Sequence, residues 1–97
     1  MAKYVVLINW TDQGVRSAKD TVTRFEQNRE AMRQMGVTIE TVFWTLGRYD
    51  LVGILDAPDD QTVATGLLRL AGLGNVRTEA LRAFTVEEMG GMVQRLG

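Results

Sequence analysis

Hydrophobic residues in this chain form short runs that alternate with segments of helical spacing. The first run, residues 4–8, is rich in β-branched and aromatic side chains and predicts a strand. Similar runs predict a second strand over 37–44, a third over 51–55 and a fourth over 76–84. The pattern therefore predicts four strands separated by helical segments.

The second predicted strand alternates, and its alternation assigns each side chain to one of two faces. One face is predicted to carry Val37, Ile39, Thr41 and Phe43. The opposite face is predicted to carry Thr38, Glu40, Val42 and Trp44.

Three helices are predicted between and after the strands. Capping residues and a closing glycine favour helices over about 20–35 and about 59–73. Thr85 and Glu88 have the spacing of a capping box and begin a last amphipathic helix. Two glycines weaken this last helix by roughly 1 kcal/mol each. We therefore expect the C-terminal helix to need a surface to lie on.

The order βαββαβ with a terminal helix predicts an α+β fold with a ferredoxin-like, four-stranded antiparallel sheet. The first and third strands are continuous apolar runs, as expected for central strands covered on both faces. Two helices can cover only one face of such a sheet. A second copy is therefore expected on the other face, giving a homodimeric α/β barrel that can assemble further into a ring. The whole range 1–97 is expected to be one domain.

Composition excludes several classes of function. The 97 residues include 11 basic and 12 acidic side chains, a net charge of −1, and no local basic cluster, so nucleic acid is not an expected partner. Cysteine and histidine are both absent, so disulfides, thiolate–imidazole zinc sites and His-based triads cannot form. No metal or cofactor is expected. The short apolar runs and the absence of a signal sequence predict a cytoplasmic protein that does not bind a membrane.

The segment 44–50 predicts a hairpin whose tip carries aromatic, cationic and anionic groups. In the predicted topology this tip lies at the end of the sheet where the first strand ends and the fourth begins. A pocket for an anionic or aromatic small molecule is predicted there. The residues expected to gather at this end are Asn9, Trp10, Trp44, Arg48, Tyr49, Asp50, Asn75 and Arg77.

Structural roles compete with ligand binding at each of these positions. Gly47 is expected to supply a positive φ in the hairpin, and Asp50 to accept backbone N–H groups. Trp10 and Trp44 are more often packing residues than stacking platforms. The two arginines suit either solvent or a bound carboxylate.

The chain resembles the GYD-domain family of small bacterial and archaeal proteins over nearly its full length. The family is named for a Gly-x-Tyr-Asp element, which falls here on Gly47, Tyr49 and Asp50. The other matching segments are Tyr4-Val5-Val6-Leu7 with Asn9, Thr11-Asp12-Gln13-Gly14, Ala57-Pro58-Asp59-Asp60 and Gly74-Asn75-Val76-Arg77-Thr78. The resemblance implies a dimeric α/β-barrel relative without an established biochemical role, and it transfers no catalytic residues.

Three functions are compatible with these residues. The first is a homo-oligomeric module that binds or senses a small molecule without catalysis. The second is a cofactor-independent monooxygenase or isomerase, in which arginines would stabilise an enolate anion and Tyr49 with Asp50 would transfer protons. The third is a ring-forming interaction protein that uses its C-terminal helix as a contact.

Overall fold

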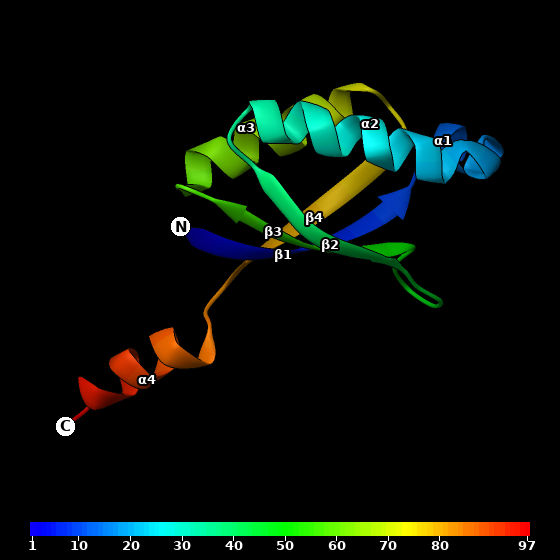
Figure 1. The fold of residues 1–97 in the computed structure, drawn as a ribbon. Coiled ribbons are helices and arrows are strands. Elements are labelled where there is room, and N and C mark those ends of the chain that lie inside the picture. Colours follow the sequence, from blue (N-terminus) through cyan, green and yellow to red (C-terminus); the bar gives the residue numbers. More distant parts are fainter.

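Four strands form one antiparallel sheet in the computed structural model, which describes residues 1–97 (Figure 1). They are β1 (Ala2–Trp10), β2 (Thr38–Trp44), β3 (Leu51–Ala57) and β4 (Val76–Ala83). Their order across the sheet is β2-β3-β1-β4, so β1 and β3 are central and β2 and β4 are the edges. The structure confirms the predicted ferredoxin-like α+β fold.

Helices cover one face of this sheet (Figure 1). Short α1 (Asp12–Arg16) and the 3-10 turn η1 (Ala18–Asp20) lead into α2 (Thr21–Gln34), and α3 (Asp60–Gly72) connects β3 to β4. The last helix, α4 (Val86–Gln94), projects away from the body on the opposite side of the sheet. No helix in the structure is both long and apolar enough to cross a membrane.

The core lies between the sheet and the helices α2 and α3. Val6, Met32 and Val37 are its largest fully buried side chains. Gly66 of α3 is buried directly over Met32, and a Cβ at this glycine would stand 2.9 Å from the Met32 sulfur. A side chain at this position would therefore hold α3 further from α2 and the sheet.

A β-bulge in β2 corrects the predicted faces of this strand. The pairing with β3 shifts between Ile39 and Thr41, which places one extra residue in β2. As a result Ile39 and Val42 both line the space under the helices. The predicted grouping of Ile39 with Thr41 and Phe43 was wrong, because strict alternation holds only in a strand without a bulge.

The face of the sheet turned away from α2 and α3 is not covered by any element of the chain, and we call it the open face (Figure 1). The register of β1 with β3 pairs Leu7 with Val52 and Val5 with Ile54 on this face. Its outer strands add Phe43, which is 61% exposed, and Leu81, which is 45% exposed. The open face is therefore apolar and partly accessible to solvent.

Candidate functional site

Asp50 fastens the β2–β3 hairpin to β1. Its carboxylate Oδ2 accepts a hydrogen bond from the Trp10 backbone N–H at 2.9 Å. Its own backbone N–H donates to the Ile8 carbonyl at 2.9 Å, and its carbonyl accepts from the Thr45 N–H at 2.8 Å. Because these bonds use both the side chain and the backbone of Asp50, they give this residue a structural role.

Of the other hairpin residues, one packs against α2 and another lies exposed to solvent. Trp44 packs edge-on against Phe25 of α2, with ring centroids 5.8 Å apart, and its Nε1 donates to Thr21 Oγ1 at 3.0 Å. Arg48 lies exposed at the tip. Gly47 has a φ of 102°, which confirms the predicted left-handed turn residue. Trp44 therefore holds the edge of the sheet against α2.

The remaining candidates lie at the same end of the sheet but on different faces. Trp10 lines a cavity of about 80 Å³ between the sheet and the helices. Asn9 and Arg77 are paired across β1 and β4 on the open face. Asn75 accepts hydrogen bonds from Gln13 Nε2 and from a backbone N–H. The candidates share an end of the sheet, but they do not all line one pocket, so ligand binding by them stays a prediction.

A shallow polar hollow of about 560 Å³ lies beside this end and brings in a residue that sequence reasoning missed. Arg16, at the end of α1, lines the hollow together with Arg77, Trp10 and Gln13. Neither arginine takes part in an ion pair. The segment around Arg16 shows no clear periodicity, and its position beside Arg77 follows only from the folded loop.

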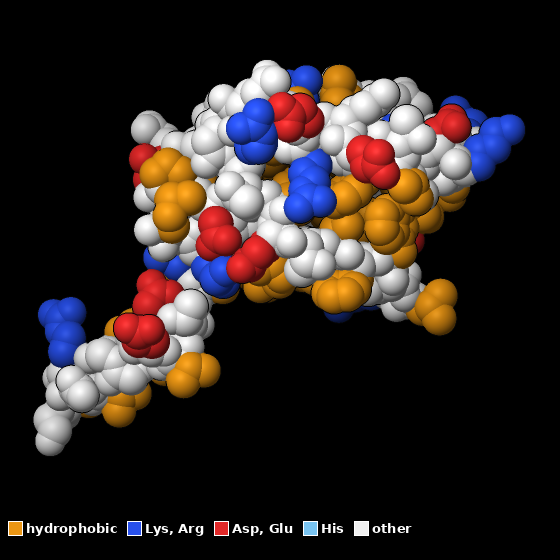
Figure 2. Space-filling model, in the orientation of Figure 1, with side chains coloured by type: hydrophobic (Ala, Val, Ile, Leu, Met, Phe, Trp, Pro, Cys, Tyr) orange, Lys and Arg blue, Asp and Glu red, His pale blue; other side chains and the backbone are white.

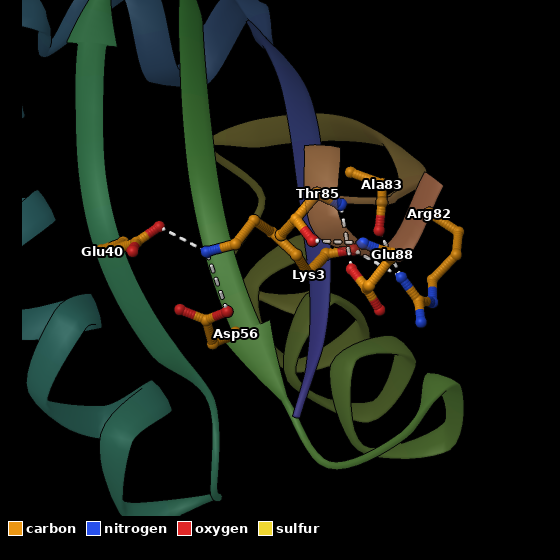
Figure 3. Close-up of polar contacts among 7 residues, drawn as sticks. All are labelled: Lys3, Glu40, Asp56, Arg82, Ala83, Thr85 and Glu88. Atoms are coloured by element: carbon orange, nitrogen blue, oxygen red, sulfur yellow. Dashed lines mark hydrogen bonds and ion pairs between the residues drawn. The ribbon is translucent and has the colours of Figure 1, made fainter. Parts of the chain in front are cut away.

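Charged residues border the apolar open face near the start of β1 (Figure 3). Lys3 Nζ lies 2.9 Å from Glu40 and 3.1 Å from Asp56, which links three adjacent strands. The hydrogen bonds that the Lys3 ammonium donates to Glu40, and next to Asp56, raise the pKa of Lys3. This border is polar and solvated, as is usual around an apolar contact surface.

The connection to α4 lies close to this border (Figure 3). Thr85 and Glu88 form the predicted capping box, in which the Thr85 N–H donates to the Glu88 carboxylate at 2.9 Å and the Glu88 N–H donates to Thr85 Oγ1 at 3.1 Å. The bond from the Thr85 N–H lowers the pKa of Glu88. The predicted start of the C-terminal helix is confirmed.

A second groove, which sequence reasoning also missed, runs between α3 and the edge strand β4. We call it the α3/β4 groove, and its volume is about 440 Å³. One end is closed by Tyr4, whose hydroxyl donates to Asp60, and by the Arg82 guanidinium 5.6 Å from the Tyr4 ring centre. Burial, followed by the bond to Asp60, raises the pKa of Tyr4 to about 12. The other lining residues are Val63, Ala64, Leu67, Leu68, Ala71, Thr78 and Ala80.

The largest sites described above are open surfaces and grooves. The structure contains no cluster of three or more acidic, His or Cys residues that could hold a metal ion. Its cavity of about 80 Å³ is well below the roughly 300–1,000 Å³ of typical small-molecule pockets. The larger features are the open face, the polar hollow of about 560 Å³, the α3/β4 groove and the exposed helix α4.

These features define a small ferredoxin-like α+β protein with uncovered apolar surfaces. The profile of the GYD domain matches residues 4–93, and the chain therefore belongs to the GYD-domain family. This confirms the resemblance seen in the sequence.

Two relatives from Thermus thermophilus are similar to the chain. One, named glutamine synthetase and cystathionine beta-lyase binding protein, is 34% identical over 90 residues, which cover 92% of this chain and 95% of the relative. The other is TTHA0845, whose crystal structure matches with a TM-score of 0.58 and 25% identity over 89% of this chain and 96% of that one. The first relative is thus named for binding other proteins.

Proposed function

We propose that this chain is a protein-interaction module that pairs with a second copy and binds metabolic enzymes. The observation that carries the proposal is the open face, where apolar side chains of all four strands stand without cover from the chain itself. Large exposed apolar patches on small proteins usually mark sites of protein association. A module of this kind needs no catalytic group, in keeping with a sequence that lacks His and Cys.

A second copy is the simplest occupant of the open face. Strands about 4.8 Å apart that rise about 3.3 Å per residue give this face roughly 450 Å² per copy. Face-to-face pairing of two such sheets keeps the border charges around Lys3 at the edge of the contact, where solvent still reaches them. The pairing would form the dimeric α/β barrel expected from the sequence.

The enzyme partner is proposed from the relative that is named for binding glutamine synthetase and cystathionine beta-lyase. That relative matches nearly all of this chain, which supports the same fold and therefore the same kinds of surface in both proteins. Binding of an enzyme fits the open face, because a protein partner can use a broad surface, whereas the cavity of about 80 Å³ between the sheet and the helices is too small for a metabolite of ordinary size.

The test is a direct binding measurement with purified enzymes. The chain is immobilised, and glutamine synthetase and cystathionine beta-lyase from the same organism are titrated over it by biolayer interferometry. Saturable binding of at least one enzyme, competed by free chain, supports the proposal. Absence of binding to both enzymes by chain that is folded by circular dichroism refutes the enzyme partner.

A small anionic ligand is a second candidate, favoured by one observation. Arg16 and Arg77 both border the polar hollow of about 560 Å³, and neither is neutralised by an ion pair. Guanidinium groups bind carboxylates and phosphates well, although the hollow is also lined by the Asp12 carboxylate. Calorimetry with a panel of dicarboxylates and phosphates, using Arg77→Ala as the control, tests this site; no heat with any compound refutes it.

A further inference from the structure

Helix α4 has an apolar stripe and no surface of its own chain to place it on. Val86, Met89 and Val93 follow one another at helical spacing, and Leu96 continues the stripe beyond the helix end. None of the helix residues is buried, and Leu96 is 85% exposed. Figure 2 shows these apolar side chains in solvent on the projecting segment. The stripe is therefore a contact surface without a partner.

Such a helix is not stable by itself. It has nine residues, and isolated helices shorter than about 12–15 residues are marginal in water even with good sequences. Its two adjacent glycines weaken it further, although the capping box favours its first turn. Burial of the apolar stripe against another surface is what can keep α4 helical.

The α3/β4 groove has the dimensions and chemistry to receive this stripe. The groove follows β4 from Thr78 to Arg82, a length of about 13 Å, and α4 is about 14 Å long. Its charged residues, Asp60 and Arg82, lie together at one end, and the remaining walls are mostly apolar. Leu68, in the α3 wall, is 73% exposed. The groove is thus an apolar surface that lacks a partner, as α4 is.

The two surfaces are poorly placed to meet within one chain. Only Phe84 and Thr85 separate β4 from α4. Thr85 is extended, with φ of −71° and ψ of 167°, as its capping role requires. The chain thereby leaves the sheet on the side opposite the helices (Figure 1), whereas the groove is lined by residues of α3. Reaching its own groove would require a reversal of direction within two residues and loss of the capping box.

We propose that α4 of one copy lies in the α3/β4 groove of a second copy. Each copy then places its own α4 in another copy's groove and receives an α4 in its own. The contact can therefore be reciprocal within one pair of copies, or it can connect one pair to the next around a ring. The inference rests on the proposed self-association, but it depends neither on pairing through the open face nor on an enzyme partner. Together the groove and the open face would account for the apolar surfaces left exposed by a single copy.

Cysteine crosslinking tests this contact, because the natural chain has no cysteine to interfere. Full-length Leu68→Cys and Met89→Cys chains are mixed in equal amounts and oxidised mildly. Both side chains are substantially exposed, so the substitutions leave the core intact. A docked helix holds the two sulfurs at a high effective concentration, and the mixed pair is expected to crosslink roughly tenfold faster than an undocked pair.

The matched control replaces Leu68→Cys with Glu26→Cys, an exposed position on α2 outside the groove. A mixed Leu68–Met89 product that forms no faster than the Glu26–Met89 product overturns the proposal. The double variant carrying both cysteines in one chain provides the second measurement. Crosslinked dimers or larger species support docking between copies, whereas a crosslinked monomer places α4 in its own groove and overturns it.

Light scattering on the wild-type chain separates this proposal from the proposed function. A dimer that persists while the Leu68–Met89 crosslink fails leaves pairing through the open face intact and rejects only the α4 contact. A crosslink that forms while neither enzyme binds supports the α4 contact and rejects only the enzyme partner. A chain that is monomeric at all concentrations rejects every form of self-association.

Discussion

Leu7→Ala tests whether the open face is the pairing surface. Leu7 lies in the middle of this face, opposite Val52 of β3 and Glu79 of β4. Alanine removes three carbon groups, worth about 0.8 kcal/mol each when fully buried. Leu7 is already half-buried in a single copy, so only about half of this burial free energy comes from pairing. The substitution should therefore weaken pairing by roughly 1.2 kcal/mol for each Leu7 replaced.

The symmetry of the pair doubles this effect. In a two-fold contact each copy contributes its own Leu7, so the expected loss is about 2.4 kcal/mol per dimer. At about 1.4 kcal/mol per factor of ten, the dissociation constant should rise on the order of 50-fold. Sedimentation velocity or light scattering over a dilution series measures this constant.

Val22→Ala is the control, because Val22 is an exposed apolar residue of α2, on the covered side of the sheet. This variant should pair as the wild type does. Circular dichroism of each sample shows whether the fold is retained. A Leu7→Ala dissociation constant within threefold of the wild-type value, in folded protein, would refute pairing through the open face.

Three further predictions concern stability. Gly14→Ala should lower the free energy of unfolding by roughly 2 kcal/mol, because its Cβ would stand 2.0 Å from the Asn75 carbonyl oxygen. Thermal circular dichroism should show a melting temperature lower by about 10 °C, and an unchanged melting temperature would contradict this. The bond from the Thr62 hydroxyl, followed by that from its N–H, lowers the pKa of Asp59 below 3.8, so the stability that Asp59 contributes is present above about pH 4 and is lost as the pH falls through the folded-state value. Asp59→Asn keeps a good helix cap but has no carboxylate to protonate. The free energy of unfolding, measured with urea at a series of pH values, should therefore fall less steeply below about pH 4 in this variant than in the wild type, and an equally steep fall would count against this role. Because the pKa of Tyr4 is raised to about 12, the stability that Tyr4 contributes is complete below about pH 10 and is lost as the pH rises toward 12. Tyr4→Phe should remove the phenolate absorbance at 295 nm that appears near pH 12 in the folded protein, and persistence of that absorbance would show that it does not come from Tyr4.

Local signals in the sequence were sufficient for the elements and their order. The capping box at Thr85 and Glu88 and the positive φ of Gly47 are set by residues close in the chain, so pattern and turn chemistry predict them well. The central position of β1 and β3 also follows from local composition, because both are uninterrupted by charge until their ends. Interactions between residues close together in the sequence were therefore sufficient to predict the fold.

The candidate site was harder to predict, because the face of the sheet on which a side chain lies depends on pairing between strands that are distant in the sequence. The sequence correctly places Trp10 and Arg77 at one end of the sheet, where both border the polar hollow, but the register puts Asn9 on the opposite face from Trp10. Arg16 reaches the same hollow through a loop that carries no periodic signal. The α3/β4 groove arises from the angle between a helix and an edge strand, for which no single segment contains the information.

The bulge at Ile39–Thr41 constrains how this family can diverge. A β2 of the same length that paired without this bulge would alternate strictly and would turn Val42 and Trp44 away from α2, toward the surface proposed for pairing. Single-residue insertions and deletions in β2 should therefore be rare outside the bulge itself among descendants of a common ancestor, or should be accompanied by replacement of the tryptophan. Comparison of divergent homologues at these positions would reveal whether the extra residue is as old as the fold.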